Sequence, residues 1–324
     1  MKMRTLISLL LFAIGYGVAS TATAQAYPVK PVKFIVTSGP GSAPDVGSRF
    51  ISAKLVEIWG RQVLIENVAG AAGNIGAERV AKSAPDGYTL LYTTAGPLQF
   101  NRSLYSKLGY DIVADFEPIT QIGRSPNILA VHPSVPVKSV QELIAYARAN
   151  PGKLRFGSPG SGSSQHLSGE LFKKMAGVDM VHVPYKDSAQ MTLDLVTGQF
   201  ELTFQNTAVI LPYVKRGQVR ALAVTGADHM PLLPELPTVA ESGLAGFEIG
   251  GHTGLLAPKG TPAPIINKVH ADMARVMSTP SVHEHFAAIG VNVSPTTPEQ
   301  FATWLKAENN RWAPIIKASG AKVD

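Results

Sequence analysis

Two glycine- and serine-rich stretches contain the residue types best suited to hold a small anion. The first, Ser38–Asp45, follows the apolar run Val32–Thr37 and leads into a helical pattern. Ser42 stands at the N-cap of the expected helix, with Pro44 in its first turn and Asp45 three residues on, as in a capping box. The preceding glycines permit close backbone approach. We therefore expect unpaired amides at the positive end of a helix, which is an anion site.

The same arrangement recurs at Phe156–His166, between a strand pattern and a helix pattern, with Ser163 or Ser164 as the cap. Its hydroxyl groups add donors. A third and weaker copy is Ala69–Gly76. Two such loops facing each other across a cleft would grip a carboxylate from both sides. Each loop alone has a simpler interpretation as a capped connector, but the recurrence in one setting favours binding.

Enzyme motifs are mostly missing from the sequence. The glycines at 70, 73 and 76 do not have the dinucleotide-binding spacing, and the chain has no P-loop. No G-x-S-x-G nucleophile elbow occurs after residue 26. Ser163 and His166, with a remote aspartate, remain as the alternative of an exported serine hydrolase. We expect no cofactor.

The histidines offer one candidate for ligand contact. His283 and His285 are two residues apart on an expected helix and so point to different faces. We interpret them as solvated surface residues, and we expect no metal site. His252 lies among small residues in Gly250–Gly254, which predicts exposure to a cleft. Ligand contact and a structural hydrogen bond are both open for it.

Composition indicates an exported protein that handles small anions. Residues 1–26 have a basic start, an apolar run and the A-x-A sequence Ala24–Ala26, which predicts a signal peptide cleaved after Ala26. The chain has no cysteine, and its remaining 298 residues are enough to bury a core without disulfides. The net charge of +6 is spread without basic clusters. This suits attraction of small anions, and we expect no nucleic-acid partner.

Apolar runs alternate with amphipathic stretches, which is typical of an α/β fold. The long extended stretch Pro118–His132 is expected to cross between domains, and Phe247–Ala257 to bring the chain back. The other expected strands are Val32–Thr37, Gln62–Glu66, Tyr88–Thr94, Leu154–Gly157, Met180–Pro184, Leu202–Gln205 and Val219–Thr225. The expected helices are Asp45–Trp59, Asn74–Lys82, Val140–Asn150, Ser164–Ala176 and Met191–Thr197, with helices dominating Pro264–Ala318.

Several motifs together resemble the Bug/TctC family, the periplasmic solute-binding proteins of tripartite tricarboxylate transporters. They cover the chain after residue 26 in order. The motifs are Tyr27–Val32, Glu66–Gly76, Ala84–Leu91, Gly157–Leu167, Val183–Lys186, Gly217–Thr225, Pro237–Glu241 and Gly254–Pro258.

The resemblance implies a two-lobed, type II periplasmic binding protein fold with a ligand cleft between the lobes. Residues 27–126 and 247–324 would form lobe 1, and residues 127–246 would form lobe 2. The ligand would be a small carboxylate, delivered to the membrane subunits of a transporter by a monomer. A ligand-dependent sensor partner is the alternative.

The family's two binding loops coincide with the two loops selected above. Asp45 is expected to orient its loop rather than to touch an anion. The expected ligand-binding residues are Ser38, Gly39, Gly41, Ser42, Asp45 and Thr94 in the first lobe, Ser158, Gly160, Ser163, Ser164, Gln205 and Asn206 in the second, and His252.

Departures from the family pattern bear on the ligand. Gln205 and Asn206 stand where many members have an acid that would pair with an ammonium group, which tilts against amino acids. His252 and Thr253 replace a Trp-Tyr pair, which makes room for a bulkier ligand and a second carboxylate. We expect an aromatic dicarboxylate such as terephthalate. Citrate and other aliphatic carboxylates are the alternative.

Overall fold

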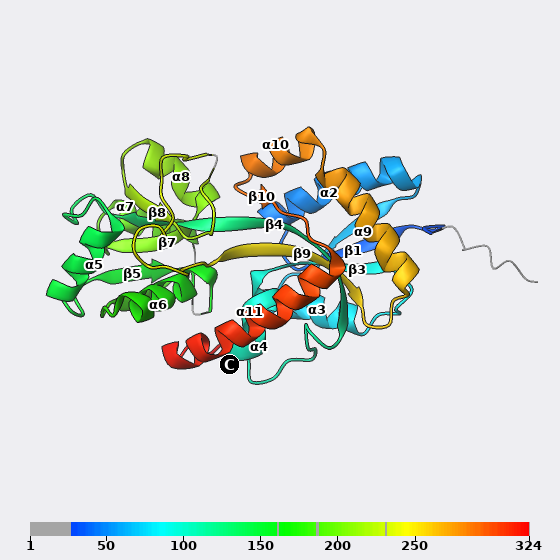
Figure 1. Ribbon diagram of the computed structural model, residues 1–324, viewed down its shortest axis with the longest axis horizontal. Coiled ribbons are helices and arrows are strands. Elements are labelled where there is room, and N and C mark those ends of the chain that lie inside the picture. Colours follow the sequence, from blue (N-terminus) through cyan, green and yellow to red (C-terminus); the bar gives the residue numbers. More distant parts are fainter. Residues whose placement is uncertain (1–26, 161, 186–187, 231, 324) are drawn as a thin grey trace, which may run out of the picture.

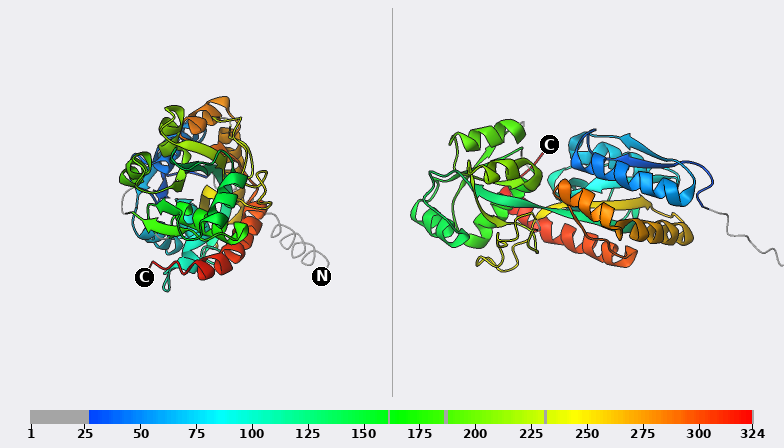
Figure 2. Two further views of the ribbon diagram at one scale, coloured as in Figure 1. Left: turned by 90° about the vertical axis from the view of Figure 1, so that its left-hand side faces the viewer. Right: turned by 90° about the horizontal axis from the view of Figure 1, so that it is seen from above.

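The computed structural model describes residues 27–160, 162–185, 188–230 and 232–323. They form two lobes joined side by side, with the long strands β4 (Phe116–Val131) and β9 (Gly250–Pro258) running between them (Figures 1 and 2). The expected signal peptide lies outside the described residues. None of the described helices has the length and apolar character needed to cross a bilayer.

The first lobe is built on a mixed sheet. In it β1 lies parallel between β2 and β3, while β9 runs antiparallel to both β3 and the first part of β4. Its other strand bounds are β1 (Val32–Val36), β2 (Val63–Asn67), β3 (Thr89–Thr94) and β10 (Asn292–Val293). Its helices are α2 (Ala43–Trp59), α3 (Asn74–Ala81), α4 (Asn101–Leu104), α9 (Ala263–Met277) and α10 (Pro280–Ala288), with a short 3-10 helix η1 (Ala71–Gly73) and a short π-helix η2 (Gly96–Phe100).

The second lobe repeats the strand–loop–helix design on a smaller sheet. The last part of β4 pairs antiparallel with β7 and β8, and β5 lies parallel between β7 and β6. The strands are β5 (Arg155–Ser158), β6 (Val181–Pro184), β7 (Leu202–Asn206) and β8 (Arg220–Val224). The helices are α5 (Val140–Ala149), α6 (Ser164–Ala176), α7 (Ser188–Val196) and α8 (Thr207–Lys215).

Strand β4 changes partners at the junction of the lobes. Pro126 is the last β4 residue paired with β9, opposite Gly250, and Asn127 is the first paired with β7. Next to this point the Ile249 amide donates to the Thr225 carbonyl at 2.9 Å. The expectation that Pro118–His132 crosses between the two halves and that the chain returns near Phe247–Ala257 is therefore confirmed.

Helix α11 (Pro298–Ser319) makes a further connection between the lobes. Phe301 and Leu305 near its start belong to the apolar core of the first lobe. Trp312 and Ile316 near its end join a cluster that contains Phe156 of the second lobe. Figure 1 shows the helix running from beneath the first lobe toward the second.

Most element positions agree with the sequence-based predictions, with shifts of one to three residues at their ends. The expected strand Gln62–Glu66 is β2 at Val63–Asn67, and the helix expected from Met191 begins at Ser188. The structure therefore confirms an α/β fold in which each predicted binding loop joins a strand to a helix.

Candidate functional site

A cleft of about 630 Å³ lies between the lobes. Among the described residues that line it, none is Asp, Glu, Lys or Arg. Its polar lining residues include Ser38, Thr94, Asn101, Ser125, Ser163, Ser164, Asn206, His252 and Thr253, and its larger apolar ones include Tyr92, Phe100, Leu104, Tyr105, Phe286, Ile289 and Val291. An anion bound here would meet neutral hydrogen-bond donors rather than formal positive charges.

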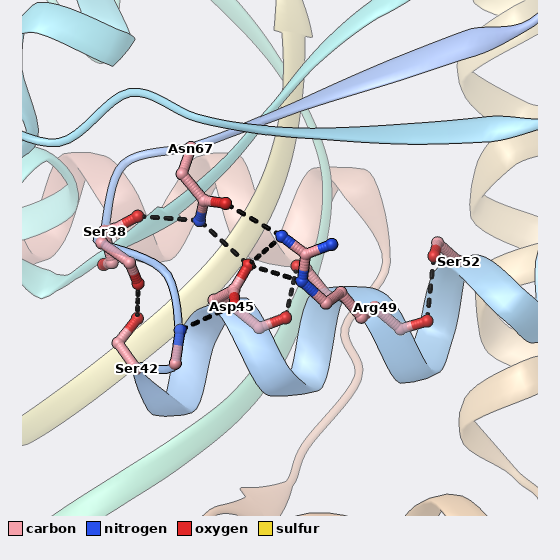
Figure 3. A network of polar contacts seen from close by, with 9 residues as sticks. Ser38, Ser42, Asp45, Arg49, Ser52 and Asn67 are labelled. Atoms are coloured by element: carbon pink, nitrogen blue, oxygen red, sulfur yellow. Dashed lines mark hydrogen bonds and ion pairs between the residues drawn. The ribbon is translucent and has the colours of Figure 1, made fainter.

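The first glycine- and serine-rich loop is organised around the buried carboxylate of Asp45 (Figure 3). Its Oδ1 accepts hydrogen bonds from Arg49 Nε and Asn67 Nδ2, and its Oδ2 accepts one from the Gly41 amide, all at 2.9 Å. The same Asn67 amide donates to the Ser38 carbonyl at 2.9 Å. These bonds tie the Asp45 carboxylate to the backbone of its own loop and to the end of β2.

The pKa of Asp45 reflects this network. Burial alone would raise it, but the hydrogen bonds from Arg49, Gly41 and Asn67 outweigh the burial, so the pKa lies below its ordinary value. The carboxylate therefore stays ionised at neutral pH and holds the loop in place.

Part of the predicted amide ring is used inside this loop. The Gly41 amide is taken by Asp45, and the Ser42 amide donates to the Gly39 carbonyl at 3.3 Å. Ser42 occupies the N-cap, but its hydroxyl donates to the Gly39 carbonyl at 2.7 Å and does not cap the helix. The predicted capping box is therefore wrong, because Asp45 bonds Gly41 instead of the N-cap amide.

The start of α2 itself faces the cleft. Ser38, Ala43 and Pro44 line it, whereas Gly39, Gly41, Ser42 and Asp45 are absent from its lining. The amides of a helix's first turn have no partner within the helix, and no side chain of Ser42 covers them. Because Pro44 has no N–H, the first-turn donors at this helix start are the amides of Ala43 and Asp45.

The second loop opens α6 in the predicted way. Ser163 is the N-cap, and its Oγ accepts a hydrogen bond from the His166 amide at 3.2 Å and donates to the Gly160 carbonyl at 2.8 Å. Ser163 and Ser164 line the cleft together with Pro159 and Gly162. The predicted residues Ser158 and Gly160 are absent from the lining, and Ser158 is buried.

A stacked histidine pair supports the second loop from behind. The rings of His166 and His182 stack with centroids 3.9 Å apart. His182 Nε2 contacts Ser158 Oγ at 2.7 Å, and His166 Nδ1 accepts a hydrogen bond from the Gly162 amide at 3.1 Å. Burial lowers the pKa of His166 to about 3 and that of His182 to about 4, so both rings are neutral at physiological pH.

These contacts do not support the alternative of a Ser163–His166 catalytic pair. Ser163 Oγ bonds the backbone amide of His166, and the His166 ring faces the Gly162 amide instead. The side chain of Ser158, which does meet a histidine ring, is completely buried. A serine nucleophile must reach its substrate and be hydrogen-bonded to its base.

Gln205 and Asn206 take different positions because neighbouring strand residues face opposite sides. Gln205 is fully buried, and its Nε2 donates to Ser188 Oγ and Thr192 Oγ1, both at 3.0 Å. Its Oε1 accepts from the Asn206 amide at 2.8 Å. Gln205 is not among the lining residues, whereas Asn206 lines the cleft and its Oδ1 accepts from the Ala208 amide.

His252 lines the cleft, but the prediction that small neighbours leave it exposed is wrong. The residue is 5% exposed, and its ring lies 4.6 Å from that of Trp304 on α11. Its Nδ1 contacts Gln99 Oε1 at 3.1 Å. Burial, with a contribution from the neighbouring Arg124, lowers the pKa of His252 to about 4, so the ring carries no positive charge at neutral pH.

The expectation for the other histidine pair is also partly wrong. His283 is exposed, but the ring of His285 stacks on Phe50 with centroids 3.9 Å apart. Helix α10 thus uses His285 to pack against α2. Within the described residues, no group of three His, Asp or Glu side chains is placed to hold a metal ion.

The third glycine loop also reaches the cleft, where Gly70, Ala72 and Gly73 line it. Ala71 and Ala72 have φ angles of 46° and 51°, which are costly for residues with a Cβ. Asn101 helps to hold this conformation, because its Nδ2 donates to the Ala72 carbonyl at 3.0 Å.

Sequence reasoning missed several residues of the site. The Asn67 side chain fixes the first loop, and the only signal for it was its place in the Glu66–Gly76 motif. Tyr92 lies inside an apolar strand, and an aromatic residue in such a strand is expected to belong to the hydrophobic core.

Comparison with known proteins identifies the relatives of the chain. The model of the tripartite tricarboxylate transporter family receptor, TctC, matches residues 48–321. BugT of Bordetella pertussis is 34% identical over 325 residues, covering 100% of both chains. The structure of Rpa4515 of R. palustris with adipate is 39% identical, with a TM-score of 0.78, and covers 92% of this chain and 100% of that one. The structure of MatC of Rhodopseudomonas palustris with bound malate is 30% identical, with a TM-score of 0.73, covering 90% and 100%.

Proposed function

Since the chain belongs to the TctC family of tripartite tricarboxylate transporter receptors, which are periplasmic solute-binding proteins, we propose that it captures a small carboxylate in the cleft between its lobes. Closure of the lobes would desolvate the ligand, and the loaded protein would deliver it to the membrane subunits of a transporter. The resemblance seen in the sequence and the expected two-lobed fold are both confirmed.

One observation carries this proposal. Ala43 and Pro44 at the start of α2 and Ser163 and Ser164 at the start of α6 come from different lobes and line the same cleft. Helix N-termini attract anions through their free amides and their partial positive charge. Because no Lys or Arg is found among the described lining residues, these amides and the nearby hydroxyls supply the charge-assisted hydrogen bonds.

A dicarboxylate is the favoured ligand class. Two relatives were solved with the dicarboxylates adipate and malate, and the cleft volume of about 630 Å³ leaves room for a larger acid. The aromatic walls Phe100, Tyr105 and Phe286 support an aromatic diacid such as terephthalate. Two features of the sequence that favoured this ligand give it less support in the structure. The side-chain amide of Gln205 is hydrogen-bonded inside the second lobe, and the His252 ring packs on Trp304.

We place the hinge where β4 changes partners. Residues 27–126 and 247–324 would then move as one lobe and residues 127–246 as the other. The pairing of Pro126 with Gly250 and of Asn127 with Asn206 supports these boundaries. The end of α11 is attached to the second lobe, because Trp312 packs in a core shared with Phe156. Closure would therefore either bend this helix or be limited by it.

A binding screen of residues 27–324 tests the proposal. Thermal shift and calorimetry would compare terephthalate, adipate, malate, citrate, benzoate, aspartate and glutamate. Ligand at 100 times its Kd adds about 2.7 kcal/mol of stability, which a melt detects. Tight binding of a dicarboxylate supports the proposal, preference for citrate supports the aliphatic alternative, and binding of none of the acids contradicts carboxylate capture.

We place the mature N-terminus at Tyr27, after cleavage behind Ala26, which mass spectrometry of the exported protein would check. A role in sensing rather than transport predicts a ligand-dependent complex with a periplasmic receptor domain, and a pull-down with and without the ligand would separate the two roles.

A further inference from the structure

One end of the cleft extends beneath helix α2 and is mostly apolar. A Cβ placed on Gly47 would lie 3.0 Å from the tip of the Phe286 ring and 3.2 Å from the Tyr92 hydroxyl. Tyr92, Phe286, Ile289 and Val291 all line the cleft. Glycine at position 47 thus lets α2 pack closely on the Phe286 ring and on the phenol, where a larger side chain would be crowded. We call these four side chains the phenol subsite.

The Tyr92 hydroxyl is the polar side-chain group of this subsite. The residue is 1% exposed, and its ring stacks on Phe34 with centroids 6.4 Å apart. Within the described part of the chain, the hydroxyl has no hydrogen-bond partner, and it is not among the fully enclosed atoms that lack one. Burial raises the pKa of Tyr92 well above its usual value, so the group stays protonated and able to donate. A nearly buried donor without an acceptor is unfavourable, and a ligand oxygen would relieve this.

The length of the first turn of α2 gives the distance between the Tyr92 hydroxyl and the expected position of the first carboxylate. Ala43 starts the helix, and Gly47 lies one turn further along, which is a rise of about 6 Å. A diacid whose carboxyl groups are joined by four carbons or by a benzene ring spans such a distance. The apolar side chains of Phe286, Ile289 and Val291 would cover its carbon skeleton.

We propose that the Tyr92 phenol donates a hydrogen bond to the second oxygen-bearing group of the ligand and thereby selects diacids over monoacids. This inference rests on the proposed function, because it takes the first carboxylate to be bound at the helix N-termini. The second group must be an acceptor, such as a carboxylate or a carbonyl. An ammonium group is disfavoured, since no Asp or Glu is among the described residues that line the cleft.

The test compares diacids with monoacids of the same size in residues 27–324. Calorimetry would measure Kd for adipate and hexanoate, and for terephthalate and 4-methylbenzoate. In Tyr92→Phe, which removes only the hydroxyl, we expect the diacid-to-monoacid preference to fall about tenfold or more, as for loss of a hydrogen bond to a charged group. Tyr88→Phe is the matched control: its hydroxyl accepts from the Val29 amide outside the cleft, and the preference should not change.

A second variant changes helix α2, which packs against the phenol subsite. Gly47→Ala places a methyl group next to the Tyr92 hydroxyl and should also reduce the diacid preference, whereas melting without ligand reports any loss of folding. An unchanged preference in Tyr92→Phe, or an equal loss for both acids of each pair, would overturn the inference. If the wild type binds none of the four acids, both the proposed function and this inference fail. If the acids bind but Tyr92→Phe keeps the wild-type preference, only this inference fails.

Discussion

Replacing Asp45 by Asn would disturb the network that shapes the first loop. Three groups donate to the two oxygens of this carboxylate, namely Arg49 Nε, Asn67 Nδ2 and the Gly41 amide. Asparagine has one acceptor oxygen and brings two donors of its own. At least one of the three groups would then face an N–H donor in a buried site, because Asp45 is 3% exposed.

The cost follows from the number of bonds that fail. A buried donor left without an acceptor costs about 1–3 kcal/mol, and the ion pair with the half-exposed Arg49 adds little because solvent screens it. We expect Asp45→Asn to lower the free energy of unfolding by about 2 kcal/mol at pH 7. For a protein of this size, that is a decrease in Tm of roughly 3 °C.

The stability contributed by the Asp45 carboxylate depends on pH. Since the pKa of Asp45 is lowered in the folded state, its contribution to stability is present above the unfolded value of about 3.9. It is lost as the pH falls through the folded value. The difference between wild type and Asp45→Asn should therefore shrink below about pH 4.

Urea unfolding of both proteins from pH 3 to pH 8 would measure this difference, and calorimetry would follow carboxylate affinity. We expect the affinity to fall as well, because the loop that presents the start of α2 is loosened. Asp179→Asn, at an exposed position, is the matched control and should change neither quantity. A stability at pH 7 within 0.5 kcal/mol of wild type, with unchanged affinity, would refute this account of the loop.

Three further predictions concern the second lobe. Gly169→Ala places a Cβ 2.2 Å from the Phe156 ring and should destabilise by about 1–3 kcal/mol; a wild-type urea midpoint would contradict the close packing. The pKa values of His166 and His182, lowered to about 3 and 4, mean that their contribution to stability is complete above about pH 6.5. It is lost as the pH falls toward 4, so His182→Asn should flatten the stability–pH curve in that window. Ser163→Ala should cost about 1 kcal/mol through loss of the N-cap and weaken carboxylate binding; calorimetry that finds wild-type affinity would remove this serine from the site.

Local patterns predicted the elements that carry the site. The apolar run before Ser38 and the proline at position 44 predicted that a strand gives way to a helix there, and α2 begins at Ala43. The length of Pro118–His132 predicted a crossing strand, because few single sheets need fifteen extended residues. These signals depend on residues that are close in sequence.

What the sequence left open depends on partners far along the chain. Whether Gln205 or Asn206 faces the cleft is a question of strand phase, and β7 has its phase set by β4 and β5. His252 is covered by Trp304, a residue of α11 some fifty positions later. Tyr92 stood in an apolar strand, and only the fold brings it to the cleft wall, with its hydroxyl against Gly47 of α2.

The most direct test of the central claim is a crystal structure of residues 27–324 with the tightest-binding acid of the screen. The account predicts one carboxylate group between the lobes, within hydrogen-bond distance of amides in the first turn of α2 and of the Ser163–Ser164 segment at the start of α6. A carboxylate held instead by a lysine or arginine side chain outside the cleft, with these two helix starts unoccupied, would contradict it.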